Sequence, residues 1–473
     1  MRPRCVLRRL HWNRLGWLRD QDVSAVTKFD LSRVAVGGLG LTGRALTEAL
    51  IARGHHVVVA DDRPEAVVEA ASDLAVEVVD ATSQEELEEL LSRVDTVVPS
   101  PGIPRHHKLL RLADDKEIAV LSELDVGSLW DHRPRIAVTG TNGKTTVTEL
   151  TTKILNNSEV KAAAIGNTEV SFVAALADQP EKNDVFVVEA SSFALDRVQH
   201  FRAQSAAWLN LSPDHLDWHG DFESYAAAKA KVFHGQGSND FAIVPHELGA
   251  LAPWLPKLEA QRITFGMSAG DVHCTRSELT AHGEKVIDIG DLPLSRPHDL
   301  LNACAAVALG LSMGASIHGA EETLAGFQGL PHRMELLVSN NEIRFFNDSK
   351  ATTPHATVAG ISGLDAVVLI AGGRNKGLDL RELASIKSQL RAVVAIGDAS
   401  EDVIEVLGKD LPATIANSME EAVSQAFQYA VRFQADVVLS PACASFDWYS
   451  NYVERGDDFK RIVDELTQER RAT

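Results

Sequence analysis

The stretch Ala137-Val-Thr-Gly-Thr-Asn-Gly-Lys-Thr-Thr146 decides the fold around it. It begins inside Arg135-Ile-Ala-Val-Thr139, a short apolar run typical of a fully buried parallel strand, and a helical pattern follows. A glycine-rich loop between a strand and a helix aims several backbone N–H groups at one point, where the helix N-terminus also favours an anion. The sequence therefore predicts an α/β nucleotide-binding domain built around a phosphate loop at 137–146.

The phosphate loop carries the groups that bind ATP and Mg²⁺. Its glycines allow a close approach of phosphate, Lys144 supplies a compact positive charge, and the Thr145 hydroxyl can hold Mg²⁺. The first glycine of the general GxxxxGK[ST] pattern is Val138 here, and Gly140 supplies the turn instead. We predict that ATP binds through Gly140, Thr141, Asn142, Gly143, Lys144, Thr145 and Thr146.

A second glycine-rich turn lies nearer the N-terminus. Gly38-Leu-Gly-Leu-Thr-Gly43 follows a predicted strand at 34–36, and a second strand at 57–60 ends at Asp61 and Asp62. This βαβ unit satisfies the dinucleotide fingerprint, which alone would suggest an NAD-dependent oxidoreductase. The pattern guarantees only a tight turn and the close approach of some diphosphate, so a uridine diphosphate fits it equally.

The length of the chain predicts three domains. Its 473 residues exceed one ordinary core, and one domain per about 150 residues is usual. Strands predicted at 366–370, 392–396 and 436–440 form a third α/β unit. We expect a Rossmann-like domain at 31–122, a mononucleotide-binding α/β domain at 123–328 and a Rossmann-like domain at 329–473. The six arginines that precede Asp20 predict a flexible basic extension at 1–30.

Composition narrows the class of protein. Hydrophobic content of 45% and charged content of 24% are average for globular proteins, and no apolar run approaches the about 20 residues of a spanning helix. A net charge of −20 repels polyanions, so we expect no nucleic-acid partner. The four cysteines match neither a zinc pattern nor a disulfide framework. The first thirty residues lack a sustained apolar segment with a small-residue cleavage site, so we expect no secretory signal there. We therefore expect a cytoplasmic protein.

Several separate motifs, in order along the chain, carry a family resemblance. Together with the phosphate loop, 209–217, 225–229, 330–333, 347–352 and 440–445 resemble the Mur ligase family from about residue 33 to the C-terminus. The first glycine-rich turn, Ser100-Pro-Gly-Ile103 and the stretch 442–447 are similar to the D-glutamate-adding branch.

The resemblance implies an activity. Such ligases phosphorylate a substrate carboxylate with ATP, and the amine of an incoming amino acid then attacks the acyl phosphate. The substrates implied are ATP, UDP-N-acetylmuramoyl-L-alanine and D-glutamate, in peptidoglycan precursor synthesis, with two Mg²⁺ ions and a monomeric enzyme. The first domain would bind the uridine nucleotide, the second ATP, and the third D-glutamate while closing on ATP. A sibling Mur ligase, a folylpolyglutamate-type ligase and, from another class, the NAD-dependent oxidoreductase are the alternatives.

The resemblance also assigns roles to residues that spacing alone does not rank. Lys144, Glu189, His215 and Lys229 are implied as catalytic residues, and Thr145, Glu189, His215 and Lys229 as metal ligands. Glu189 ends a predicted strand, where open α/β sheets place ligand-binding groups, and its hard oxygen suits Mg²⁺. Lys229 would serve as a carbamate formed with CO₂, which requires a neutral amine.

The remaining implied contacts fall into three groups. On the adenine and ribose side they are Asp299, Asn302, Arg333 and Asp348. For the uridine nucleotide substrate they are Leu41, Thr42, Asp62, Arg63, Ser100, Gly102, Asn167 and Ser191. For D-glutamate they are Thr352, Lys376, Ser445, Phe446 and Tyr452.

Three residues depart from the family pattern. Asp299 stands where an asparagine is common, Ala194 where a glutamine is usual, and Glu169 where a Gly-Asn-Ile-Gly pattern has its last glycine. The first two affect hydrogen bonds on the adenine and uridine-substrate sides. None of the three removes a charged group of the chemistry.

Overall fold

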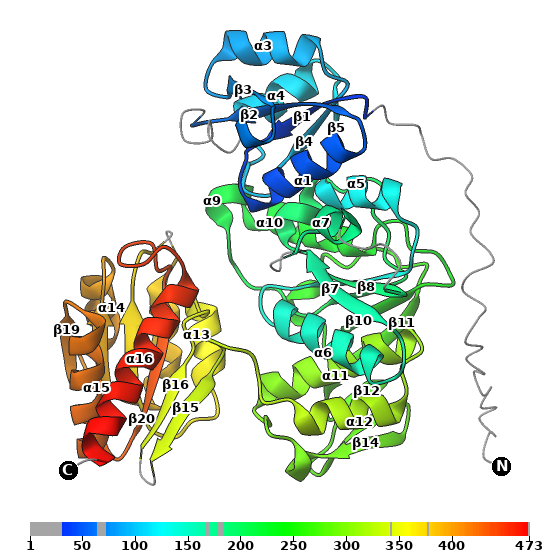
Figure 1. The fold of residues 1–473 in the computed structure, drawn as a ribbon. Coiled ribbons are helices and arrows are strands. Elements are labelled where there is room, and N and C mark those ends of the chain that lie inside the picture. The colour runs from blue at the N-terminus through cyan, green and yellow to red at the C-terminus, as the bar shows by residue number, and fades with distance from the viewer. Residues whose placement is uncertain are drawn as a thin grey trace, which may run out of the picture.

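The computed structural model describes residues 31–63, 72–166, 170–177, 183–340, 343–375 and 378–471. They form three α/β domains, each with its own largely parallel sheet, which confirms the predicted fold class. The N-terminal domain stacks on the central domain, and the C-terminal domain lies beside the central one (Figure 1). The predicted basic extension at 1–30 lies outside the described residues.

The N-terminal domain has a five-stranded parallel sheet in the order β3-β2-β1-β4-β5, which is the Rossmann order. A Cβ at Gly43 would lie 1.9 Å from the carbonyl oxygen of Gly38, so only glycine lets the first helix approach this turn. The described elements are β1 (Arg33–Gly37), α1 (Leu41–Ala52), β2 (His56–Asp61), β3 (Glu77–Asp80), α3 (Gln84–Ser92), β4 (Thr96–Pro99), α4 (Lys108–Asp115) and β5 (Ala119–Val120).

The central domain has a nine-stranded sheet in the order β14-β13-β12-β11-β10-β9-β6-β8-β7, antiparallel only at β12-β13 and β13-β14 among the described strands. Its strands are β6 (Arg135–Thr139), β7 (Ala162–Gly166), β8 (Val185–Glu189), β9 (Ser205–Trp208), β10 (Phe241–Pro245), β11 (Gln261–Met267), β12 (Val272–Cys274), β13 (Glu278–Ala281) and β14 (Glu284–Asp288). Its helices are α5 (Glu123–Trp130), α6 (Lys144–Asn156), α7 (Phe172–Ala177), α8 (Ser192–Asp196), α9 (Leu216–His219), α10 (Phe222–Ala230), η2 (Lys231–Phe233), η3 (Gly249–Leu251), η4 (Ile289–Asp291), α11 (Pro297–Ser312) and α12 (Ile317–Gly326).

The C-terminal domain has a six-stranded sheet in the order β15-β16-β20-β17-β18-β19, with an antiparallel hairpin at the β15 edge. Its strands are β15 (Glu335–Asn340), β16 (Ile343–Asn347), β17 (Val367–Gly372), β18 (Leu390–Ile396), β19 (Ala413–Ala416) and β20 (Asp436–Ala442). Its helices are α13 (Pro354–Ile361), η5 (Leu380–Ile386), α14 (Ser400–Leu407), α15 (Met419–Phe433) and α16 (Tyr452–Arg471).

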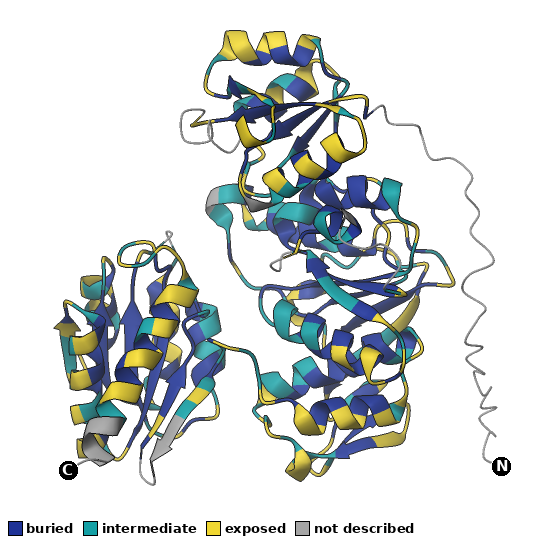
Figure 2. Cartoon of the chain, viewed as in Figure 1, coloured by how far each residue is buried: buried dark blue, intermediate teal, exposed yellow. Residues whose placement is uncertain are grey.

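The strands are buried between helical layers (Figure 2). In β6, Ile136 and Val138 pack into the core cluster that contains α6 and α11, whereas Ala137 packs into the cluster on the other face. This alternation follows from the two-residue period of a strand, and burial on both faces explains why the whole stretch is apolar. The phosphate loop therefore begins at the carboxyl end of a rigid strand flanked by β8 and β9.

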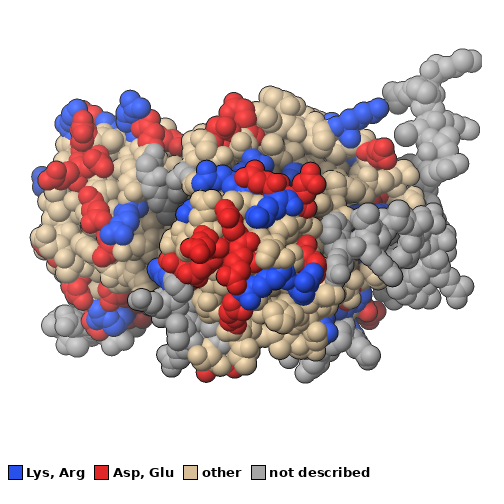
Figure 3. Space-filling model, turned by 90° about the horizontal axis from the view of Figure 1, so that it is seen from above, with Lys and Arg blue, Asp and Glu red and all other residues tan. Residues whose placement is uncertain are grey.

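Surface charge is mixed. On the face seen from above, acidic side chains alternate with smaller groups of lysines and arginines (Figure 3). Within the described residues, no helix is long and apolar enough to cross a membrane.

Two buried acids join α5 to the central domain. Asp125 accepts hydrogen bonds from the backbone N–H groups of Gln199, His200 and Phe201, at 2.7–3.1 Å for Oδ1. Glu123 accepts one from the N–H of Val173 at the start of α7, at 2.7 Å. Although α5 directly follows the last strand of the N-terminal sheet, these contacts make it part of the central domain.

The buried Glu123 makes stability depend on pH. Burial raises the pKa of Glu123 from 4.5 to about 7, so the folded protein holds this proton more tightly than the unfolded chain. The free energy of unfolding should therefore fall as the pH rises from the lower to the higher of these two pKa values. At higher pH it should stay lower, by about 3 kcal/mol at most. We expect the melting temperature of Glu123→Gln, relative to the parent protein, to increase between about pH 5 and about pH 8. An increase that also occurs in Glu85→Gln, at an exposed site on α3, would contradict this account.

Candidate active site

The backbone of the phosphate loop requires its glycines. Gly143 caps α6 with a φ of +84°, and a Cβ there would lie 2.5 Å from the side-chain oxygen of Asn302. Gly140 has a φ of +159°, and a Cβ there would lie 3.0 Å from Leu209. The loop is therefore packed tightly against α11 and the segment after β9.

The 209–217 motif shapes the phosphate loop through hydrogen bonds. Asn210 Oδ1 accepts from the N–H of Asn142 at 2.9 Å, and its Nδ2 donates to the Asn142 carbonyl oxygen at 3.1 Å. Thr141 Oγ1 accepts from the N–H of Ser212 at 2.9 Å and lies 3.0 Å from the Tyr225 hydroxyl. Asn210 and Tyr225 were not predicted as site residues, although both lie in motifs that carry the family resemblance.

Two predicted catalytic lysines meet at one carbonyl oxygen. Lys144 Nζ donates to the Gly140 and Thr141 carbonyl oxygens at 3.0 and 2.9 Å, and Lys229 Nζ from α10 donates to Gly140 at 2.7 Å. Lys229 is only 1% exposed. Burial, and then the neighbouring Lys144 ammonium, lower the pKa of Lys229 well below its ordinary value of 10.5. The site therefore favours a neutral amine at Lys229.

The buried carboxylate of Glu189 acts on four cations of this region. Glu189 ends β8 and lies beside Val138 and Gly166 in the neighbouring strands. Its charge raises the pKa values of Lys144, Lys229, Arg333 and Lys350, against the larger lowering effect of burial on each. Cations from the central and C-terminal domains thus converge on the end of one central strand.

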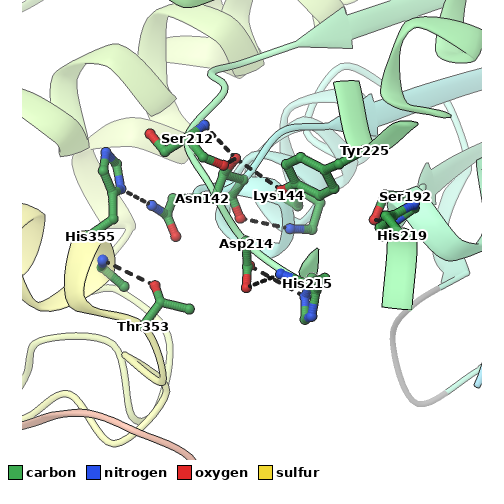
Figure 4. Close-up of polar contacts among 12 residues, drawn as sticks. Asn142, Lys144, Ser192, Ser212, Asp214, His215, His219, Tyr225, Thr353 and His355 are labelled. Atoms are coloured by element: carbon green, nitrogen blue, oxygen red, sulfur yellow. Dashed lines mark hydrogen bonds and ion pairs between the residues drawn. The ribbon is translucent and has the colours of Figure 1, made fainter. Parts of the chain in front are cut away.

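His215 lies at the start of α9, with a left-handed φ of +52°. Its Nε2 is 3.3 Å from Asp214 Oδ2 (Figure 4). Its ring packs edge-on against Phe193, at 4.7 Å between centroids. In the described parts of the chain, no three His, Cys, Asp or Glu side chains form a metal cluster. Of the four predicted metal ligands, Glu189 and His215 are of these residue types. The other two are Thr145 and Lys229.

A cleft of about 580 Å³ lies between the central and C-terminal domains. Its lining includes residues of the phosphate loop, of α11 and of the segments around β16. The residues predicted for ATP that line it are Asn142, Gly143, Thr146, Asp299, Asn302, Arg333 and Asp348. The predicted Gly140, Thr141, Lys144 and Thr145 lie in the same loop but do not line the cleft.

Two hydrogen bonds bring the C-terminal domain to the phosphate loop. Arg333 donates to the Thr145 hydroxyl at 2.6 Å, and His355 Nδ1 lies 2.5 Å from Asn142 Nδ2 (Figure 4). Lys350 also lines the cleft, and burial lowers its pKa from 10.5 to about 8. The roles of His355 and Lys350 were not predicted, although Lys350 lies inside the 347–352 motif.

The two acidic residues predicted on the adenine and ribose side, Asp348 and Asp299, both accept hydrogen bonds from other groups of the protein. Asp348 accepts from Ser440 Oγ at 2.7 Å and from the N–H of Met334 at 3.1 Å, and burial raises its pKa from 3.8 to about 7. Asp299, the departure from the family pattern, accepts from Arg296 Nε at 2.8 Å. Its negative charge is therefore balanced within the same turn of the chain.

The residues predicted for D-glutamate lie on neighbouring segments of the C-terminal domain. Lys350 Nζ is 3.9 Å from the ring centroid of Tyr452, Ser445 is buried, and Phe446 is 56% exposed. Thr352 is in the loop after β16 and donates its N–H to the Lys350 carbonyl oxygen at 2.9 Å. Lys376 lies outside the described residues.

A buried arginine joins the two loops that carry these residues. Arg455 on α16 donates to the Ser349 carbonyl oxygen at 2.9 Å and to the Cys443 carbonyl oxygen at 3.2 Å. It is 1% exposed. Sequence reasoning missed it because an arginine within a charged helix reads as a solvent-facing residue.

Several residues predicted for the uridine nucleotide lie in the loops that follow β1, β2 and β4 of the N-terminal domain. Ser100 Oγ donates to the Gly38 carbonyl oxygen at 2.8 Å, and Asp62 Oδ1 lies 2.9 Å from His107 Nε2. Asp61 accepts from the N–H of Arg63 at 2.9 Å, which fixes the turn after β2.

The remaining uridine-side predictions are spread over two domains. Thr42 lies in the first turn of α1, Gly102 follows Ser100 in the loop after β4, and Ser191 caps α8 by accepting from the N–H of Ala194 at 3.1 Å. The side chain of Leu41, and the whole of Asn167 and Glu169, lie outside the described residues.

Protein-family models and known proteins match this chain along nearly its whole length. The models of the Mur ligase MurD-like N-terminal domain, the Mur ligase middle domain and the Mur ligase glutamate ligase domain match residues 32–122, 138–310 and 332–443. A UDP-N-acetylmuramoylalanine–D-glutamate ligase of Desulfosudis oleivorans is 36% identical, over 92% of this chain and 97% of that protein. One of Alkaliphilus oremlandii is 33% identical, over 92% and 98%.

Solved structures share the fold. The UDP-N-acetylmuramate-alanine ligase MurC of Thermotoga maritima aligns with a TM-score of 0.55 and 17% identity, over 93% of this chain and all of that one. MurF of Acinetobacter baumannii aligns with a TM-score of 0.56 and 17% identity, over 91% and 94%. With three family models matched in order and relatives above 30% identity along almost its full length, the chain belongs to the Mur ligase family.

Proposed function

We propose that this protein is an ATP-dependent ligase that joins D-glutamate to UDP-N-acetylmuramoyl-L-alanine through an acyl phosphate, in peptidoglycan precursor synthesis. The observation that carries the proposal is the convergence of Lys144, Arg333 and Lys350 on Glu189 beside a cleft between two domains. Phosphoryl transfer to a carboxylate needs such a cluster, because both reactants are anions. The names of the relatives supply the two substrates that are joined.

In the first step, an oxygen of the substrate carboxylate forms a bond to the γ-phosphorus of ATP, and the bond to the bridging oxygen of ADP breaks. The phosphate loop holds the phosphates through its backbone N–H groups. Lys144 and Arg333 neutralise the repulsion between the two anions as they approach, since Arg333 already reaches the loop at Thr145. The two domains therefore share the charge stabilisation of this step.

In the second step, the amine nitrogen of D-glutamate attacks the acyl carbon, and phosphate leaves with the oxygen that came from the carboxylate. The nitrogen loses one proton as the amide forms. Thr352, Lys376, Ser445, Phe446 and Tyr452 are the proposed D-glutamate contacts. A lysine with hydroxyl donors suits two carboxylates, and the position of Lys350 beside Tyr452 adds a second cation there.

Magnesium fits the donor set at the end of β8. Glu189 offers a buried hard oxygen, and Thr145 offers a hydroxyl at the start of α6. We propose that Thr145, Glu189, His215 and a carbamate on Lys229 hold two Mg²⁺ ions, which supply neutralisation of phosphate charge. The lowered pKa of Lys229 supports the carbamate, because a neutral amine is the form that combines with CO₂.

The uridine nucleotide is proposed to bind between the N-terminal and central domains. Its contacts would be Leu41, Thr42, Asp62, Arg63, Ser100, Gly102, Asn167 and Ser191. The close packing of Ser100 against the first glycine-rich turn supports a diphosphate site at that turn. The phosphate loop and its cations favour this reading over an NAD-dependent oxidoreductase, which would not need Lys144.

The function is tested by phosphate release from ATP in the presence of UDP-N-acetylmuramoyl-L-alanine. We expect release to require D-glutamate, with L-glutamate and the absence of an amino acid giving only background. Equal rates with D- and L-glutamate would contradict the assignment of the amino acid. Release that depends on a different amino acid would favour a sibling ligase.

A further inference from the structure

A small second cleft lies where the N-terminal domain meets the central domain. Its walls come from the loop after β4, from the start of α5, and from α8 and α9. Its lining includes Ser100 and Arg105 from the N-terminal domain and Ala194, Asp196 and Arg197 from the central domain. The two domains that carry the proposed uridine-nucleotide contacts therefore face each other across it.

An ion pair bridges the two domains at this cleft. Arg105 Nε, from the N-terminal domain, lies 2.9 Å from Asp196 Oδ2 at the end of α8. The Asp196 side chain is only 2% exposed, and burial raises its pKa against the opposing effect of Arg105. The backbone of Asp196 is held separately, because Lys231 donates to its carbonyl oxygen. The carboxylate is therefore fixed on the central domain and aimed at the N-terminal domain.

A second, more exposed pair lies next to the first. Arg197 donates to both carboxylate oxygens of Asp114, at 3.0 and 3.1 Å. Here the arginine comes from the central domain and the acid from α4 of the N-terminal domain, so the two pairs point in opposite directions across the boundary. The Asp114 side chain is 55% exposed, and solvent screening weakens this contact.

The Arg105–Asp196 pair connects the two segments that carry proposed substrate contacts. Arg105 follows Ser100 and Gly102 in the same loop, and Asp196 ends the short helix that Ser191 caps. A ligand that touches both segments binds more tightly when their relative position is already fixed, because binding then costs less ordering of the protein. We propose that Arg105 and Asp196 are positioning residues that lock the N-terminal domain onto the central domain and set the affinity for the uridine nucleotide substrate. This inference rests on the proposed function.

The pair differs from an ordinary surface salt bridge. Exposed pairs contribute little because water screens them, whereas removing the partner of a buried carboxylate leaves an uncompensated charge. In Arg105→Ala, the Asp196 carboxylate would keep only the weaker effects of the Lys231 and Arg197 charges. The domain boundary would lose this contact, while the hydrogen bonds of the phosphate loop to Asn210, Ser212 and Arg333 involve neither Arg105 nor Asp196 and would remain.

The test is steady-state kinetics of Arg105→Ala with each substrate varied in turn. We expect the KM for UDP-N-acetylmuramoyl-L-alanine to rise by about tenfold, with kcat and the KM for ATP changed by less than about twofold. Arg105→Lys should recover part of the loss. A loss of folded protein would lower the apparent kcat and leave both KM values unchanged, so a rise confined to the KM for the uridine substrate separates positioning from mere stability.

Two further variants sharpen the result. Arg33→Ala removes a comparably exposed arginine whose pair with Asp95 stays inside the N-terminal domain, and its KM values should match those of the parent protein. In the double variant Arg105→Ala/Asp196→Asn, the KM should rise no further than in Arg105→Ala alone. An unchanged KM in Arg105→Ala, or equal increases for ATP and the uridine substrate, would overturn the inference. A parent protein without D-glutamate-dependent phosphate release would instead overturn the proposed function.

Discussion

Replacing Lys144 with alanine is expected to reduce D-glutamate-dependent phosphate release by about a thousandfold or more. Lys144 places its ammonium at the Gly140 and Thr141 carbonyl oxygens, at the mouth of the phosphate loop. Without it, the charge developing on the transferring phosphoryl group loses its nearest cation, and no neighbouring side chain on α6 can replace it. Phosphate release under saturating substrates is the measurement.

The fold should survive this change. Burial lowers the pKa of Lys144, which means that the folded protein gains little from holding this cation in place. The melting temperature of Lys144→Ala should therefore stay close to that of the parent protein. Lys153→Ala, at an exposed lysine of the same helix, is the matched control and should keep full activity. If Lys144→Ala retained a tenth of the parent activity, the phosphate-neutralising role would be wrong.

Replacing Lys229 with alanine is expected to reduce phosphate release by about a hundredfold or more. The Lys229 amine is buried next to Lys144, Asp214 and Glu189, and burial lowers its pKa. A carbamate there would replace a cation with an anionic metal ligand. Bicarbonate or a short-chain carboxylic acid should restore part of the activity of Lys229→Ala, because a free carboxylate can enter the space that the side chain leaves.

The carbamate also has a direct signature. Carbon-13 NMR of the parent protein in ¹³C-bicarbonate should show a carbamate resonance that Lys229→Ala lacks. Lys257→Ala, at an exposed lysine of the same domain, should keep both the resonance and the activity, without any effect of added acid. A Lys229→Ala protein that no carboxylic acid rescues, together with a parent spectrum without the resonance, would exclude the carbamate.

The sequence alone was sufficient to predict the fold class and much of the phosphate loop. The apolar run 135–139 predicted a strand buried on both faces, and β6 has that environment. The glycines at 140 and 143 were predicted from close approach, and the structure shows which atoms approach them. These features are local, because each depends on a few neighbouring residues along the chain.

Contacts between domains could not be predicted in this way. The pairs Arg333–Thr145 and His355–Asn142 join residues far apart in the sequence, and they depend on how two separately folded domains pack. Charged side chains that are buried were missed for a related reason. Asp125 and Arg455 read as solvent-facing residues of helices, yet both are buried because they bind backbone groups of distant segments.

The central claim is that the reaction passes through an acyl phosphate, and isotope transfer tests it directly. UDP-N-acetylmuramoyl-L-alanine is labelled with ¹⁸O in both oxygens of its alanine carboxylate and converted with ATP and D-glutamate. The account predicts that each released phosphate carries one ¹⁸O, while the new amide keeps the other. Released phosphate without ¹⁸O, or label found in AMP, would contradict it.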